Sequence, residues 1–188
     1  MRRISSIFLS GPDLWFPDAA DHARRKREAC EAAGYAGVSP FDGVLTETEP
    51  SEAMAREIYA DNITRLKACD ALIANLTPWR GPSCDPGTAF EMGYASALKM
   101  PVFAYMNVSD EEDADHRSRV EMLAGARLED DGSIRDDNGC LIEDFGLPEN
   151  LMLWAEARRF FVIVTPDPIG DITGLELALD AVRLYDSD

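Results

Sequence analysis

Two carboxylic acids lie close together in the stretch CDPGTAFEMGYA, which begins at Cys84. Asp85 and Glu91 suit glycosyl transfer, in which one carboxylate attacks an anomeric carbon while another carboxyl group assists the leaving group. Thr88 and Glu91 also have the spacing of a capping box, in which two side chains satisfy each other's backbone N–H groups at a helix start. Spacing alone favours capping, because capping boxes are common and acidic pairs are frequent in an acidic protein. Catalysis by Glu91 is the competing interpretation.

The expected position of Glu91 in the first turn of a helix predicts its charge. The positive end of a helix stabilises an anion by about 0.3–1 kcal/mol, which favours the ionised carboxyl group. We therefore expect Glu91 to be a carboxylate at neutral pH.

Alternating apolar runs and helical segments are expected to position these acids. The strand candidates are residues 4–9, 35–38, 71–76, 102–106 and 160–164, and the helix candidates are residues 17–33, 51–67, 88–98, 149–157 and 173–184. Strands that alternate with helices predict a parallel sheet covered on both faces. We expect an α/β protein with a flavodoxin-like three-layer fold and a five-stranded parallel sheet. Residues 1–188 are expected to form a single domain with a polar excursion at about 107–145.

The loops after the strands are the places to search for a ligand site, because open parallel sheets bind ligands beyond the carboxyl ends of their strands. The loop after the first strand reads SGPDLWFPD and contains Gly11, Trp15 and Phe16. Its aromatic side chains either fold back on the core or form a platform for a flat heterocycle, and we take Gly11 and Trp15 as candidate substrate contacts. Arg80, after the third predicted strand, either binds a substrate phosphate or, as is more common, pairs with a nearby acid.

Composition argues against several classes of partner. The chain has 35 Asp and Glu residues against 18 Lys and Arg, and its formal net charge of -17 would repel a nucleic-acid polymer or an anionic membrane surface. The 4 Cys residues lack paired C-x-x-C spacing, which argues against a zinc site and for reduced thiols. We therefore expect a soluble cytoplasmic protein without a metal. His22 and His116 are expected to face solvent.

Four segments resemble the nucleoside 2-deoxyribosyltransferase family and occur in the same order. They are the first strand ending in S-G-P, residues 61–74, the run DPGTAFEMGYA, and FGLPENLML near the carboxyl end. The resemblance is closest to the kinetoplastid-like branch that uses purines. It implies base exchange between 2'-deoxyribonucleosides and free nucleobases, without a cofactor.

Catalytic roles follow from this resemblance position by position. Glu91 would be the nucleophile that forms a covalent deoxyribosyl ester, so that two inversions would give net retention. Asp85 would hold the base or the sugar and assist proton transfer to the departing heterocycle. Asn62, with Asp61 beside it, falls in a helix segment that faces the pocket.

The carboxyl-terminal motif implies an oligomer. Asn150 and Met152 match residues that, in this family, the neighbouring subunit contributes to the sugar's hydroxyl side, so a homodimer or homohexamer with shared sites is implied. One position departs from the family pattern. Where many relatives have a Tyr whose hydroxyl contacts the nucleophile, this chain has Phe8, which has no hydroxyl to donate. Phe8 is still a candidate substrate contact, but Glu91 needs another hydrogen-bond partner.

Two other functions stay open at this stage. One is hydrolysis of 2'-deoxynucleoside 5'-monophosphates by the same covalent chemistry, with water in place of a base and the phosphate on the loop around Ser10 and Gly11. The other is a non-catalytic nucleotide-binding module, in which Glu91 only caps its helix.

Overall fold

Five parallel strands form the centre of the computed structural model, which describes residues 3–43 and 49–187. Their order across the sheet is β2-β1-β3-β4-β7, which is the order of flavodoxin-like folds and confirms the predicted fold class. The strands are β1 (Ser6–Ser10), β2 (Ala36–Val38), β3 (Ala71–Asn75), β4 (Val102–Val108) and β7 (Phe160–Val164).

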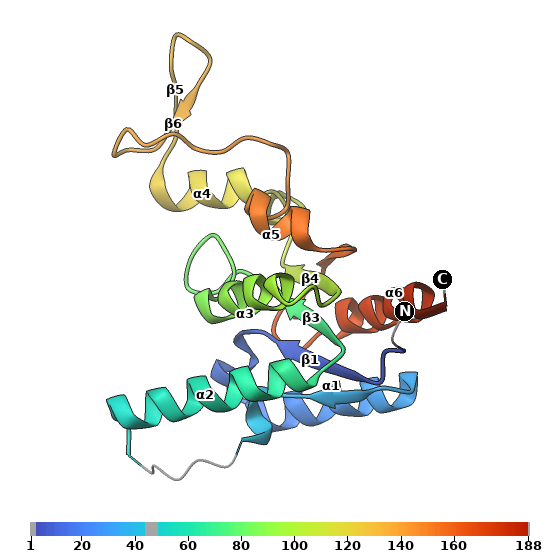
Figure 1. Cartoon of the computed structure of the whole chain (residues 1–188). Helices are drawn as coiled ribbons and strands as arrows, with labels where there is room; N and C mark the ends of the chain where they lie inside the picture. The colour runs from blue at the N-terminus through green and yellow to red at the C-terminus, as the bar shows by residue number, and fades with distance from the viewer. Residues whose placement is uncertain (1–2, 44–48, 188) are drawn as a thin grey trace.

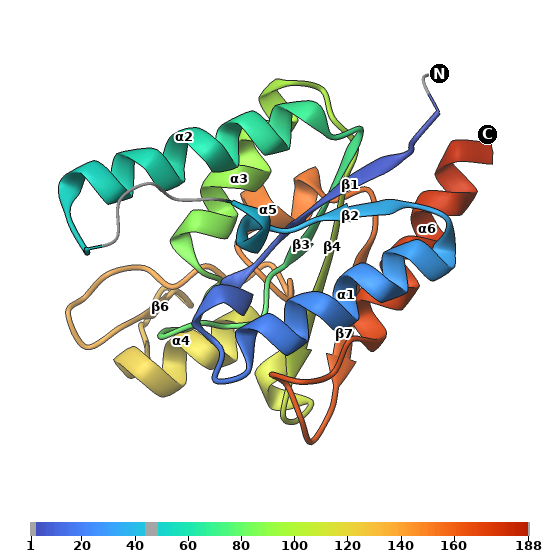
Figure 2. The same cartoon turned by 90° about the horizontal axis from the view of Figure 1, so that it is seen from below.

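Helices cover both faces of the sheet (Figures 1 and 2). Helices α1 (Ala19–Ala33) and α6 (Thr173–Ser187) pack on one face, and α2 (Glu52–Ala68), α3 (Pro86–Ala97) and α5 (Leu151–Glu156) pack on the other. Short 3-10 turns follow three of the strands: η1 (Pro12–Trp15), η2 (Pro40–Asp42) and η3 (Glu112–Ala114). The sheet is therefore the middle of three layers.

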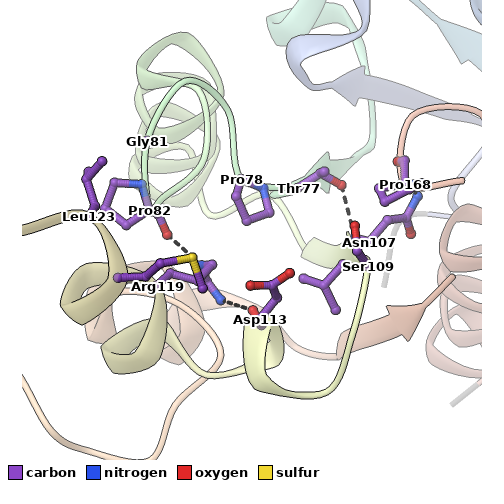
Figure 3. A pocket seen from close by; sticks show the side chains of 12 residues that line it. Thr77, Pro78, Gly81, Pro82, Asn107, Ser109, Asp113, Arg119, Leu123 and Pro168 are labelled. Carbon is purple, nitrogen blue, oxygen red and sulfur yellow. Dashed lines mark hydrogen bonds between the residues drawn. The ribbon is translucent and has the colours of Figure 1, made fainter. Parts of the chain in front are cut away.

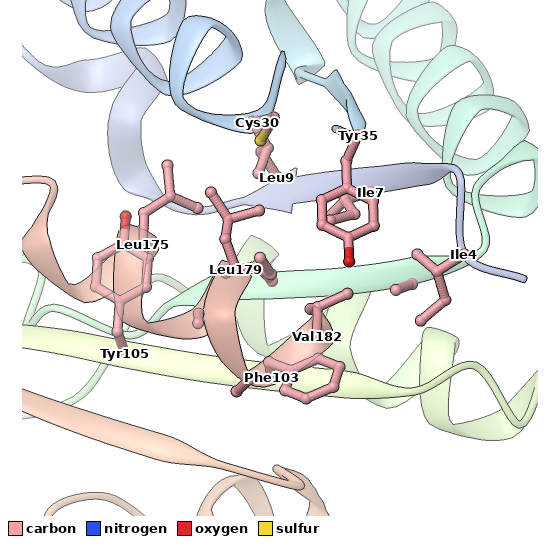
Figure 4. Packing of buried hydrophobic residues seen from close by; sticks show 14 residues of the cluster. Ile4, Ile7, Leu9, Cys30, Tyr35, Phe103, Tyr105, Leu175, Leu179 and Val182 are labelled. Atoms are coloured by element: carbon pink, nitrogen blue, oxygen red, sulfur yellow. The ribbon is translucent and has the colours of Figure 1, made fainter. Parts of the chain in front are cut away.

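Strand β1 illustrates how alternation distributes side chains between the two layers. Ile7 and Leu9 belong to the apolar cluster under α1 and α6, which Figure 4 shows, whereas Phe8 belongs to the cluster under α2 and α3. Successive side chains of a strand point to opposite faces, so Ser10 lies on the same face as Phe8. The last residue of β1 therefore presents a hydroxyl group towards α3.

The predicted polar excursion contains regular structure. Strand β4 continues to Val108, and the helix α4 (His116–Ala124) and the antiparallel strands β5 (Arg127–Leu128) and β6 (Ile134–Arg135) follow it. Figure 1 shows that the β5–β6 hairpin projects away from the sheet beyond α4. The excursion therefore begins two residues later than predicted and adds a helix and a hairpin to the edge of the molecule.

Both histidines are buried, so the prediction that they face solvent is wrong. His22 is 5% exposed, and its Nε2 lies 3.5 Å from Oδ1 of Asp13. His116 is 9% exposed, and its ring lies between the carboxylates of Glu143 and Glu149. The charged residues around each histidine in the sequence did not reveal that its ring packs against a carboxylate outside its own helix. None of the helices in the described ranges combines the length and apolar character needed to cross a bilayer.

Candidate active site

Glu91 lies where three elements of the fold meet. It is in the second turn of α3, and Ser10 at the end of β1 donates its hydroxyl hydrogen bond to Glu91 Oε2 at 2.5 Å. Asn62 of α2 donates from Nδ2 to Glu91 Oε1 at 3.5 Å, the longest distance at which such a contact counts as a hydrogen bond. The carboxyl group is therefore held by two neutral donors from the neighbouring strand and helix.

Asp85, not a capping box, begins helix α3. Its side chain accepts a hydrogen bond from the backbone N–H of Thr88 at 3.1 Å, and Pro86 occupies the first helical position. An acidic N-cap followed by Pro is a common helix start, because Pro has no N–H that needs a partner there. The helix begins two residues before the predicted start, so the capping interpretation of Glu91 is wrong.

Burial controls the charge of Glu91. Withdrawal from water raises its pKa from 4.5 to about 7, the hydrogen bond from Ser10 opposes this rise, and the negative charge of Asp85 adds to it. The expectation of a fully ionised carboxylate at neutral pH is therefore wrong. Glu91 lies beyond the first turn, where the helix end acts most strongly, and desolvation outweighs what remains of that effect.

The loop after β1 passes close to the neighbouring strand at Gly11. A Cβ atom at this position would lie 2.8 Å from Cβ of Asn75, so a larger residue would push the loop away from β3. Asn75 in turn donates from Nδ2 to Asp13 Oδ1 at 2.9 Å, and Asp13 pairs with the buried Lys26. Glycine and this buried polar cluster together fix the path of the loop beside the candidate site.

The two aromatic residues of the same loop differ in burial. Phe16 is 5% exposed and packs against the rings of His22 and Trp79, so it folds back on the core. Trp15 is 58% exposed. The Arg80 guanidinium lies 5.7 Å from the centre of its ring and 4.9 Å from that of Trp79. Within the described residues Arg80 forms no ion pair, and stacking replaces the expected pairing with an acid.

Asp61 is drawn away from Glu91 by a charged neighbour. It accepts a hydrogen bond from Arg65 Nε at 2.7 Å, one helical turn along α2, whereas Asn62 reaches Glu91. Phe8 is fully buried and packs among apolar residues of β3, α2 and α3. The structure therefore places Phe8 in the core behind Ser10, out of reach of a ligand in the loop region.

Asn150 and Met152 lie at the start of α5. Asn150 caps this helix by accepting from the backbone N–H of Met152 at 3.1 Å, and its Nδ2 donates to Glu143 at 3.1 Å. Met152 is 71% exposed. Across the described part of the chain, neither residue hydrogen-bonds to Glu91. The structure of one chain thus leaves these two predicted contacts apart from the nucleophile.

Ser10 is the hydrogen-bond partner of Glu91 that sequence reasoning missed. The sequence placed it in the S-G-P motif and in a loop that could hold a phosphate, and Phe8 indicated that the carboxyl group of Glu91 lacked a partner. The period of two in a strand gave the missing signal, because it places Ser10 on the same face as Phe8.

The fold and this cluster together describe a flavodoxin-like protein with a partly buried carboxyl group at the carboxyl end of β1. Residues 7–152 match the nucleoside 2-deoxyribosyltransferase family, and the chain therefore belongs to that family.

One solved relative agrees with this assignment, and two further proteins are similar in sequence or in fold. A solved 2-deoxyribosyltransferase of Leishmania mexicana is 29% identical, with a TM-score of 0.59 over 83% of this chain and 89% of that chain. A Schizosaccharomyces pombe protein described as uncharacterized is 28% identical over 159 residues, covering 80% of this chain and 75% of its own length. A conserved protein of Enterococcus faecalis is 17% identical, with a TM-score of 0.53 over 95% of this chain and 98% of that chain, and shares the fold.

Proposed function

We propose that the protein exchanges the base of 2'-deoxyribonucleosides through a covalent deoxyribosyl ester on Glu91. The observation that carries the proposal is the arrangement of Ser10, Asn62 and Glu91, in which a partly buried carboxyl group meets only neutral donors among the described residues. Its pKa of about 7 makes both protonation states accessible near neutral pH. Membership of the family supports the reaction class.

The first half of the reaction needs an ionised Glu91. One carboxylate oxygen attacks the anomeric carbon, the bond from that carbon to the base nitrogen breaks, and the bonding electron pair leaves with the base. Ser10 holds Oε2 at 2.5 Å, whereas Oε1 has only the 3.5 Å contact with Asn62. Oε1 is therefore the better placed oxygen to form the ester.

Asp85 is the proposed partner of the departing base. One of its oxygens accepts from the backbone of Thr88, and its charge reaches Glu91 strongly enough to raise the pKa of that residue. A proton held between Asp85 and a base nitrogen would neutralise the charge that develops on the leaving group. In the second half, another base attacks the ester from the vacated face, Glu91 is released, and the nucleoside keeps its configuration.

The aromatic group beside the site is the proposed platform for the base. Trp15 is exposed, Trp79 lies in the facing loop, and Arg80 stacks on both rings. A flat heterocycle could stack on these rings in place of the Arg80 guanidinium. Gly11 leaves the neighbouring backbone free of a side chain, which suits close approach of the sugar. We propose purines as the preferred bases, as the resemblance of the sequence motifs to the purine-using branch of the family implies.

We further propose that the site is completed in a homodimer or homohexamer. Asn150 and Met152 would reach the sugar of the neighbouring subunit, and Asp61 would help to form the receiving surface on α2. The exposure of Met152 supports this role, because a side chain with 71% of its surface in water has room to meet a second chain.

The deciding experiment is chromatography of the purified protein after incubation with 2'-deoxyinosine, with and without adenine. New deoxyadenosine is expected from the wild type and not from Glu91→Gln. The matched control is Glu52→Gln, which removes a glutamate whose side chain is 80% exposed and which should keep full activity.

Other products would contradict the proposal in distinct ways. Hypoxanthine without deoxyadenosine would show the hydrolase. No product from purine donors, pyrimidine donors or 5'-monophosphates would show a binding module, in which Glu91 has no reactive role.

A further inference from the structure

A cavity separate from Glu91 lies beyond the carboxyl ends of β3 and β4. It has a volume of about 400 Å³ and is enclosed by the loop after β3, the end of β4 and the helix α4 (Figure 3). Neither Ser10 nor Asn62, the residues that hold Glu91, lines it. The loop after β3 separates the two regions, because Trp79 packs towards Phe16 while Pro78 and Pro82 line the cavity.

Asn107 lines the cavity and has a side-chain acceptor without a partner. The residue is 1% exposed, and its Nδ2 donates to the backbone oxygens of Pro168 at 3.0 Å and Asp171 at 2.9 Å. Two carbonyl partners fix the orientation of the amide, because only its NH₂ group can donate to both. In the described part of the chain, Oδ1 is left with no hydrogen bond. A buried acceptor of this kind is costly unless a donor meets it.

Arg119, on the opposite wall, already makes several hydrogen bonds within the protein. Its guanidinium donates to the backbone oxygens of Pro82, Asp113 and Pro148, each at 2.6 Å, and its charge faces Glu149 at 3.5 Å. The side chain of Asp113 also lines the cavity and adds a second group that accepts hydrogen bonds. Asn107 Oδ1 and the carboxylate of Asp113 can both accept hydrogen bonds, so this part of the cavity suits ligands that donate N–H groups.

Apolar side chains form the rest of the lining. Pro78 and Pro82 come from the loop, and Met122 and Leu123 come from α4. Binding pockets for small molecules combine such walls with a few placed polar groups, and about 400 Å³ lies near the lower end of their usual range. The volume thus suits a one- or two-ring molecule more than a complete nucleotide.

We propose that this cavity is a second ligand site for a flat heterocycle that carries amino N–H donors, directed at Asn107 Oδ1 and the carboxylate of Asp113. The proposed role of this cavity is binding alone. The proposal does not depend on the transfer reaction, since binding at this cavity needs no turnover.

Methyl NMR of methionine-labelled protein tests this directly. Met122 lines the cavity, and Met92 follows Glu91 on α3, so their methyl signals report the two regions separately. The Met122 signal is expected to shift on titration with adenine, in the wild type and equally in Glu91→Gln. Hypoxanthine, which lacks the exocyclic amino group, is the matched probe and should bind at least about tenfold more weakly.

Three variants connect the shift to the cavity. Asn107→Leu should weaken adenine at Met122 by about tenfold or more, and Asp113→Asn should weaken it less. Leu123→Trp places a larger side chain at the exposed edge of the cavity without altering a buried hydrogen bond. It should therefore abolish the Met122 shift, and it serves as a test even if Asn107→Leu folds poorly.

Four results would overturn the proposal: no Met122 shift at millimolar adenine, equal affinity for hypoxanthine, a shift that survives Leu123→Trp, or a shift lost in Glu91→Gln. Failure of base exchange in the chromatographic assay would leave each of these results unchanged. The two proposals can therefore fail separately.

Discussion

Glu91→Gln should stabilise the protein, and by more at alkaline pH than at acidic pH. The pKa of Glu91 is raised from 4.5 to about 7 in the folded chain, chiefly by burial. Between these two values the folded state binds more protons than the unfolded state, so stability falls as pH rises through this window. Above about pH 7 the folded protein carries the full cost of a buried, ionised carboxylate.

The size of the effect follows from the shift. One pKa unit corresponds to about 1.4 kcal/mol. The full shift therefore lowers the unfolding free energy by on the order of 3 kcal/mol as pH rises through both pKa values. Gln has a similar shape and no charge to lose. The difference in unfolding free energy between Glu91→Gln and the wild type should therefore grow by about 2.5 kcal/mol between pH 5 and pH 8.5.

Urea denaturation of both proteins at the two pH values measures this difference, because all other groups titrate alike in the pair. Glu52→Gln is the control, since its carboxylate is 80% exposed and pairs only with an exposed arginine. If the difference in unfolding free energy between Glu91→Gln and the wild type stays constant with pH, the raised pKa of Glu91 is refuted. A difference that shrinks with rising pH would show that the helix end, and not burial, controls Glu91.

Three further predictions concern the groups around the site. Ser10→Ala removes a hydrogen bond that lowers the pKa of Glu91, so the acid limb of the pH–rate profile should move to higher pH, whereas an equal loss of rate at every pH would contradict this. Asp85→Asn keeps a capping side chain and removes a charge that raises the pKa of Glu91, so the same limb should move to lower pH, while Asp85→Ala should also cost about 1 kcal/mol in thermal unfolding. Lys26→Met leaves Asp13 buried without its cation and should cost about 3–5 kcal/mol in urea unfolding, with the double variant Lys26→Met/Asp13→Asn more stable than Lys26→Met alone.

The order of elements was predictable because alternating apolar and helical segments allow few topologies. A parallel sheet covered on both faces then places the ends of β1 and β3 together, which is where Ser10 and α3 meet. The helix start was harder, since Asp85-Pro86 and Thr88-x-x-Glu91 are both valid start signals and local sequence does not choose between them. In the folded chain the helix begins at Asp85-Pro86.

Charge states were predicted less well than positions. The sequence gives the place of Glu91 in a helix, and this suggested an ionised group, but its burial by β1 and α2 depends on contacts from distant segments. His22 and His116 were misplaced because the local sequence does not show that Asp13 and Glu149 pack against their rings. Helix α4 also escaped prediction, since its polar composition resembles that of a loop.

A comparison of two buried carboxylates explains why Glu91 is suited to react and Asp13 is not. Burial alone would raise the pKa of Asp13, but the charge of Lys26 and the contact with His22 outweigh it and hold that pKa well below its usual range. An anion fixed by a cation is a poor nucleophile, and Asp13 accordingly holds the loop after β1. Glu91 has only Ser10 and Asn62 as hydrogen-bond partners within the described residues, and both are neutral. Its negative charge is therefore weakly compensated, so formation of a neutral ester relieves a cost that the folded protein carries whenever Glu91 is ionised.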